Sequence, residues 1–158
     1  MSDEFWEEDP YYTGPPLTGE MVRGAEALLG VALPRTYLEL LARRNGGTPR
    51  RRCVFTPFPT SWAPDHIEIR GLRGIGGEWG IDSPELGSRY MVEEWGYPDV
   101  GVVICQMPSA GHDTVMLDYR GCGARGEPAV VYVDEDRVPR RIASSFAGFV
   151  AALTSCPD

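Results

Sequence analysis

Two kinds of hydrophobic periodicity follow one another along this chain, and their order constrains the fold more than any other feature. Apolar residues recur at helical spacing near both ends of the chain, whereas the segments between consist largely of short apolar runs of strand length. Short connections between successive strands favour antiparallel pairing. The 158 residues therefore predict a single α+β domain, in which a mainly antiparallel sheet is flanked by helices.

Capping and turn residues predict where these elements begin and end. Thr18 is suited to cap the first helix, and Gly30 is suited to end it in the left-handed conformation. Helices are expected from Thr18 to Gly30, from Pro34 to the Gly46-Gly47 pair, from Ser83 to Trp95, and from Ser144 or Ser145 to Leu153. Strands are expected at residues 53–55, 66–70, 102–106, 114–119 and 129–133.

The first 17 residues differ in composition from the rest. They hold five acidic residues, three prolines and no basic residue, which opposes a helix or a strand. Residues 1–17 are therefore interpreted as an acidic, aromatic N-terminal arm, and residues 18–158 as the folded domain. The arm either packs back on the domain through its aromatic residues or frays.

The charge balance limits the classes of partner. All 15 basic residues are Arg, and 23 acidic residues bring the formal net charge to −8. Binding to a nucleic-acid backbone needs clustered positive charge, so nucleic acid is not expected as the partner. The triplet Arg50-Arg51-Arg52 is expected to form surface ion pairs. No apolar run approaches the roughly 18 residues of a membrane span, so no membrane partner is expected either.

The four cysteines, Cys53, Cys105, Cys122 and Cys156, contain no CxxC pair. The N-terminus is acidic and lacks the positive charge and apolar stretch of a secretory signal. We therefore expect a cytoplasmic protein whose four thiols are free.

The sequence offers no recognisable catalytic or metal motif. The glycine-dense stretch 71–80 fails the G-x-G-x-x-G spacing, and Ser109 lacks the first glycine of G-x-S-x-G. The spacings of the cysteines and of His66 and His112 fit no zinc template. No catalytic residue, metal or cofactor is therefore expected, and the chain is predicted not to be an enzyme. A small hydrolase that uses His112, Asp113 and a cysteine is kept as the least favoured alternative.

Several short motifs, in order, resemble those of one known family. Leu33-Pro34-Arg35-Thr36-Tyr37 precedes a helix that runs into Asn45-Gly46-Gly47. Further along the chain come Gly111-His112-Asp113, Asp118-Tyr119, Gly126-Glu127-Pro128, and a strand that ends in Asp134. Together with the helix from Ala143 to Leu153, this series resembles the SUKH superfamily, in its Smi/Knr branch, over roughly residues 18–153. Asp113 and Asp118 are expected to bind local backbone amides.

The resemblance implies a protein that acts by binding. It implies that bacterial members are immunity proteins, which bind and neutralise a cognate toxin that is often a nuclease, and that fungal members are regulatory scaffolds. For this chain we expect a basic toxin as the partner. The contact with the partner is expected at exposed acids beside aromatic residues, namely Glu78, Trp79, Glu93 and Glu94. Trp95 belongs to the same stretch, but packing in the core is favoured for it. The family has no catalytic residues to transfer to this chain.

Overall fold

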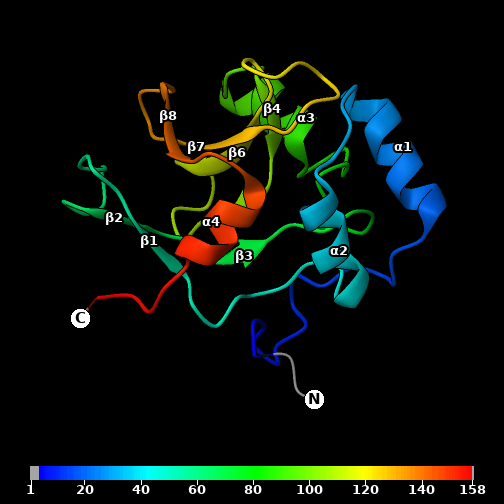
Figure 1. Ribbon diagram of the computed structural model, residues 1–158, viewed down its shortest axis with the longest axis horizontal. Helices are drawn as coiled ribbons and strands as arrows, with labels where there is room; N and C mark the ends of the chain where they lie inside the picture. The colour runs from blue at the N-terminus through cyan, green and yellow to red at the C-terminus, as the bar shows by residue number, and fades with distance from the viewer. Residues whose placement is uncertain (1–3, 158) are drawn as a thin grey trace.

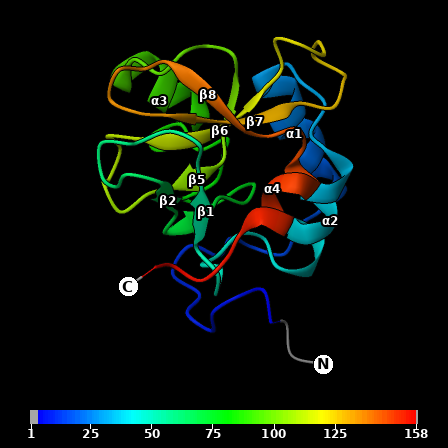
Figure 2. The same cartoon turned by 60° about the vertical axis from the view of Figure 1, so that its left-hand side comes forward.

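The computed structural model describes residues 4–157 and has three layers (Figure 1). A four-stranded antiparallel sheet in the order β4-β6-β7-β8 forms the middle layer. The helices α2 and α4 lie side by side on one face with α1 next to α2, and α3 covers the other face (Figures 1 and 2). The helices are α1 (Gly19–Leu29), α2 (Arg35–Arg43), α3 (Ser88–Trp95) and α4 (Phe146–Ala152). The sheet strands are β4 (Gly101–Val103), β6 (Thr114–Asp118), β7 (Ala129–Val133) and β8 (Pro139–Ala143). The predicted α+β class is confirmed.

Both faces of this sheet are buried, because strand residues alternate between two hydrophobic clusters. The face toward α2 and α4 carries Val102, Val115, Leu117, Val130 and Tyr132. The face toward α3 carries Val103, Met116, Val131 and Val133. The two central strands are therefore apolar almost throughout, which is typical of strands covered on both sides.

Two short two-stranded sheets complete the fold. The strands β1 (Cys53–Phe55) and β2 (His66–Glu68) form a hairpin that projects from the body, visible at the left of Figure 1. The strand β3 (Gly71–Leu72) pairs with β5 (Cys105–Gln106). The chain from 101 to 106 therefore changes partner at Ile104, whose carbonyl accepts a hydrogen bond from Arg73 at 2.8 Å. This switch places the glycine-rich loop after β3 next to the main sheet.

Cys53 and Cys156 form a disulfide, so the expectation of four free thiols is wrong. The C-terminal segment runs beside β1, where the backbones of Cys53 and Thr154 exchange two hydrogen bonds. A sequence separation of 103 residues gave no indication that the two thiols would meet. Cys105 and Cys122 remain free.

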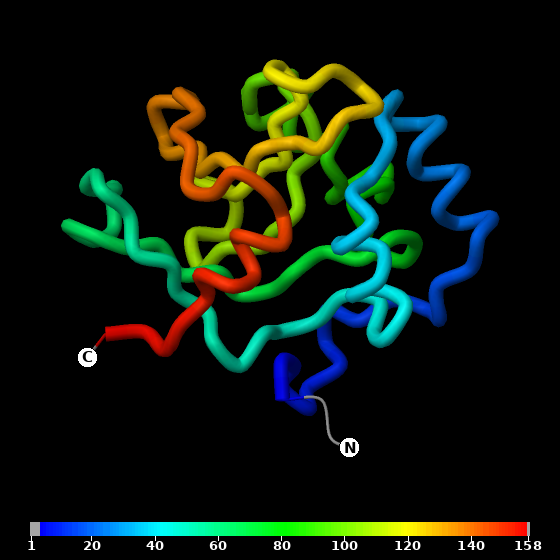
Figure 3. The backbone as a smooth tube through the Cα atoms, in the orientation of Figure 1, coloured from blue at the N-terminus to red at the C-terminus, as the bar shows by residue number. Residues whose placement is uncertain are grey.

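The described part of the N-terminal arm lies along the segment that follows α2, as the tube in Figure 3 shows. Trp6 is 2% exposed and forms a β-bridge with Pro49. Arg44 donates to the carbonyl of Glu7 at 2.6 Å, and Arg50 forms an ion pair with the Glu7 carboxylate at 3.2 Å. Buried aromatic surface and backbone hydrogen bonds thus hold the arm on the domain.

The element boundaries agree with the sequence at some points and differ at others. Thr18 caps α1 and Gly30 ends it with φ 72°, as expected. The helix α3 begins at Ser88 and not at Ser83, because residues 83–87 form a turn in which Gly87 donates to the Ser83 carbonyl. The strand β8 was not predicted, since this edge strand is only partly buried and carries two arginines. No helix within residues 4–157 has the length and apolar character needed to cross a membrane.

Candidate protein-binding site

A groove of about 450 Å³ lies between the glycine-rich loop, α3 and the loop that joins β5 to β6. Its walls include the aromatic rings of Tyr12, Trp79, Tyr90 and Trp95, and we call it the aromatic groove. The four rings come from three segments of the chain: the N-terminal arm, the glycine-rich loop and α3. Large aromatic side chains around a concave surface are typical of binding sites for other proteins.

The glycine-rich loop is fixed by two buried side chains from the region of α2. The carboxamide of Asn45 donates to the carbonyl of Ile75 at 2.7 Å and accepts from its amide at 2.8 Å. The hydroxyl of Tyr37 donates to the carbonyl of Arg73 at 2.6 Å. A side chain at Gly74 would collide with Asn45, because a Cβ there would lie 2.4 Å from the Asn45 carbonyl oxygen. The family-like motif from Leu33 to Gly47 therefore positions one wall of the groove.

Trp79 sits on this loop and packs against the arm. Its ring lies 5.1 Å from that of Tyr12 and 5.6 Å from that of Tyr11, measured between centroids. Burial, the largest effect, raises the pKa of Tyr12, so its hydroxyl is neutral at physiological pH. The arm thus forms part of the groove and packs against the indole of Trp79, one of the contact residues predicted from the sequence.

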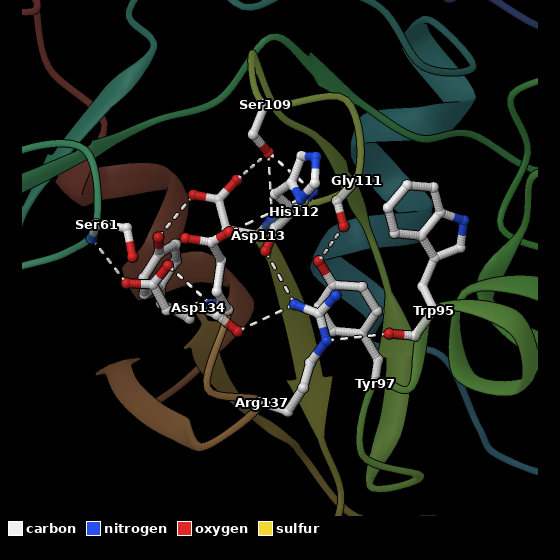
Figure 4. Close-up of polar contacts among 11 residues, drawn as sticks. Ser61, Trp95, Tyr97, Ser109, Gly111, His112, Asp113, Asp134 and Arg137 are labelled. Atoms are coloured by element: carbon white, nitrogen blue, oxygen red, sulfur yellow. Dashed lines mark hydrogen bonds and ion pairs between the residues drawn. The ribbon is translucent and has the colours of Figure 1, made fainter.

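On the opposite side, α3 is held by Arg137, whose guanidinium Figure 4 shows against the Tyr97 ring and bonded to the carbonyl oxygen of Trp95. The guanidinium donates to the carbonyls of Trp95 at 3.1 Å and His112 at 2.9 Å. It also lies over the Tyr97 ring at 3.9 Å, and the Tyr97 hydroxyl donates to the Gly111 carbonyl at 2.7 Å. These contacts fix the end of α3 to the loop between β5 and β6, so the groove has two rigid walls.

Behind that loop lies a buried carboxylate, also drawn in Figure 4. Asp113 accepts hydrogen bonds from the hydroxyls of Ser109 at 2.5 Å and Tyr132 at 2.6 Å. Burial raises the pKa of Asp113, and these hydrogen bonds oppose the rise. The expectation that Asp113 binds local backbone amides is wrong, because its partners among the described residues are side chains: the two hydroxyls and the indole of Trp62. Asp118 does accept from a local amide, that of Arg120 at 2.9 Å.

Some of the contact residues predicted from the sequence line this groove, and others are exposed near it. Trp79 and Trp95 both line it. Trp95 is partly buried and also packs against the hydrophobic cluster on the α3 face of the sheet, in line with the core packing favoured for it. Glu78 is exposed next to Trp79, and Glu94 is exposed one helical turn from Tyr90. Glu93 forms an ion pair with Arg89 at 3.4 Å.

Sequence reasoning missed Tyr12, Tyr90 and Arg73. The first two carried a signal in their aromatic character, but nothing in the sequence indicates that an arginine inside a strand-loop junction would be buried.

The hydrolase alternative gains no support from the geometry. Burial raises the pKa of the Cys105 thiol, which is the opposite of what a nucleophilic thiolate needs. His112 lies 3.8 Å from Glu135 on the surface. Within the described residues, the one group of three side chains spaced for a metal is Cys53, Glu68 and Cys156. Its two cysteines are joined in the disulfide, so their sulfurs are not available as thiolate ligands.

The fold is a small α+β domain with a groove lined by aromatic side chains. The model of the SMI1 / KNR4 family (SUKH-1) matches residues 16–152, so the chain belongs to this family. Membership implies a protein-binding role. Comparison with curated proteins and with solved structures gave no match.

Proposed function

We propose that this protein is an immunity protein that neutralises a cognate toxin by binding it stoichiometrically through the aromatic groove and its acidic rim. The observation that carries the proposal is the convergence of Trp79 and Trp95 on one groove in a protein of the SUKH-1 family. The protein would act without catalysis, by covering the active site or another essential surface of the toxin.

Charge supports a basic partner. The net charge is −8, and Glu78 and Glu94 are exposed beside the groove-lining Trp79 and Trp95. Toxins that attack nucleic acid must attract phosphate, so their surfaces tend to be basic. An acidic binder is steered toward such a surface, and its association rate falls as the ionic strength rises.

The direct test is co-expression with the products of the genes adjacent to the one that encodes this chain, with growth and complex formation as readouts. We expect protection of the host and a one-to-one complex. The double variant Trp79→Ala/Glu94→Ala is expected to weaken binding by tenfold or more, since aromatic anchors dominate interface energetics. If the wild-type protein neither binds nor protects against its neighbour's product, the proposal is wrong.

A matched control uses exposed residues away from the groove. Glu39 lies on α2, where it forms an ion pair with Arg35, and Leu28 is exposed on α1. The double variant Leu28→Ala/Glu39→Ala removes one apolar and one acidic side chain, as the test variant does. It is expected to bind and protect like the wild type.

The second candidate function is a regulatory scaffold of the Smi/Knr type that binds an endogenous protein. The same family membership favours this function. The partner recovered by affinity capture distinguishes the scaffold from the immunity protein, because recovery of a housekeeping protein in place of a toxin supports the scaffold function. We also propose a cytoplasmic location. The Cys53–Cys156 disulfide removes the free-thiol argument for it, so this location depends on the immunity function alone.

A further inference from the structure

Arg73 is a buried cation inside the aromatic groove. The residue is 1% exposed, yet it contributes to the lining of the groove. One terminal nitrogen of its guanidinium donates to the carbonyls of Leu86 at 2.7 Å and Trp79 at 3.3 Å. Its Nε is buried without a hydrogen-bond partner among the described residues. The described residues therefore satisfy only part of the hydrogen-bonding capacity of the Arg73 guanidinium.

Its charge also lacks a counterion among the described residues. The groups that act on it electrostatically are the Cys105 thiol and the phenols of Tyr37 and Tyr12, and no ion pair to Arg73 occurs within residues 4–157. Burial lowers the pKa of Arg73 to about 10, which still leaves it charged at neutral pH. An uncompensated buried charge is costly for a protein, and a partner carboxylate would relieve that cost.

The rest of the groove lining also carries positive and not negative charge. The lining includes a second arginine, Arg70, whose side chain is exposed at the rim, and no Asp or Glu of residues 4–157 belongs to it. This is unusual on a protein with 23 acidic and 15 basic residues. The remaining lining is aromatic and apolar, with Trp79, Tyr90 and Met91 among it. The groove is thus complementary to a carboxylate that is flanked by apolar groups.

We propose that the aromatic groove receives a Glu or Asp side chain of the partner protein, flanked by apolar residues, whose carboxylate pairs with Arg73. This inference deepens the proposed function, since it names the chemistry of the partner at the groove. The partner surface then carries two features: basic residues that face the acidic rim at Glu78 and Glu94, and one protruding carboxylate that enters between the rings. A hydrolytic or nucleolytic active site, where a carboxylate lies in a basic surrounding, has this combination.

The test uses the folded wild-type protein and three capped tripeptides, acetyl-Leu-Glu-Leu-amide and its Gln and Lys counterparts. Binding is followed by the indole ¹H–¹⁵N resonances of the tryptophans and by the Nε–H resonance of Arg73. Trp79 and Trp95 report on the groove, while Trp6 in the arm and Trp62 in the connection between β1 and β2 do not line it and are internal controls. We expect the Glu peptide to shift both groove indoles and the Arg73 resonance, and to bind about tenfold more tightly than the Gln peptide.

Two variants distinguish specific pairing of the peptide carboxylate with Arg73 from nonspecific attraction of the peptide to positive charge at the groove. Arg73→Lys keeps the charge but loses the planar fork, so it is expected to reduce the preference for Glu over Gln to about threefold or less. Arg70→Gln removes the exposed rim charge and is expected to have a smaller effect.

Equal affinity for the Glu and Gln peptides, preference for the Lys peptide, or no saturable shift of the groove indoles would each overturn the inference. Because the assay contains no toxin, its failure leaves the proposed immunity function standing, and a failed toxin test leaves the carboxylate site to be judged by these peptides.

Discussion

The side chain of Asn45 pairs with both polar groups of the Ile75 backbone, donating to its carbonyl and accepting from its amide. The same carboxamide donates to the carbonyl of Pro15 in the N-terminal arm at 2.7 Å. One buried amide therefore joins the end of the α2 region, the arm and the glycine-rich loop that carries Trp79. The walls of the aromatic groove depend on this residue although it does not line the groove.

Replacing Asn45 with Ala is expected to lower the free energy of unfolding by about 3 kcal/mol. The substitution leaves the buried amide and carbonyl of Ile75 without partners, at about 1–3 kcal/mol for each unsatisfied group. Urea denaturation followed by tryptophan fluorescence measures the loss. Thr36→Ala, at an exposed position on α2, is the control and should change stability by less than about 0.5 kcal/mol. A loss below about 1 kcal/mol for Asn45→Ala would contradict the role assigned to this side chain.

The double variant Cys53→Ser/Cys156→Ser is expected to lose about 2–4 kcal/mol of stability. The disulfide closes a loop with a sequence separation of 103 residues, so its removal enlarges the unfolded ensemble. Urea denaturation with and without a reductant measures the effect, and the reductant should no longer destabilise the variant. Cys122→Ser, at an exposed free thiol, is the control. Thiol titration of the denatured, unreduced wild type should find two free thiols, and a count of four would refute the pairing.

The variant Asp113→Asn is expected to gain stability relative to the wild type as the pH rises. Burial raises the folded-state pKa of Asp113 above the ordinary value of 3.8, so the folded protein holds this proton more tightly than the unfolded chain does. The wild type therefore loses stability from about pH 4 up to the folded-state pKa, whereas Asn does not titrate. Urea denaturation at a series of pH values gives the difference.

Asp136→Asn provides a control of opposite sign for this measurement. The hydrogen bond from Arg140 lowers the pKa of Asp136, so this carboxylate stabilises the protein above pH 4 and stops doing so on acidification. The stability of Asp136→Asn relative to the wild type should therefore fall as the pH rises. The same pH trend in both variants would contradict the environments described for the two carboxylates.

At position 137, Gly is expected to be tolerated better than Ala. Both substitutions remove the contacts of Arg137 with Trp95, His112 and Tyr97, and both are expected to be destabilising. The backbone has φ 61°, a left-handed conformation that costs a residue with a Cβ about 1 kcal/mol. Thermal and urea denaturation of the two variants should therefore differ by about 1 kcal/mol in favour of Gly. Equal stabilities would indicate that the loop relaxes out of this conformation.

The sequence predicted those parts of the fold whose signals are local. Thr18 and Gly30 mark the ends of α1 because a cap and a left-handed glycine act on neighbouring backbone groups. The central strands β6 and β7 were recognisable because burial on both faces makes them almost continuously apolar. The edge strand β8 was not predicted, since its half-buried Arg140 and exposed Arg141 give it the composition of a loop.

The candidate site was predicted in part. An exposed acid beside a tryptophan is visible in the sequence, and it directed attention to Glu78, Trp79 and Glu94. The position of Trp95 on the same groove was not visible, because the glycine-rich loop and α3 meet only after the chain between 101 and 106 switches from one sheet to the other.

The sequence by itself determined the α+β class, the helix caps and the family, because each depends on the type and spacing of residues along the chain. The tertiary structure alone decided that Cys53 meets Cys156, that Asn45 holds Ile75, and that Arg73 is buried without a counterion among residues 4–157. These three outcomes depend on which segments, distant in sequence, become neighbours in the folded protein. That is decided when helices and loops pack on the two faces of the central sheet.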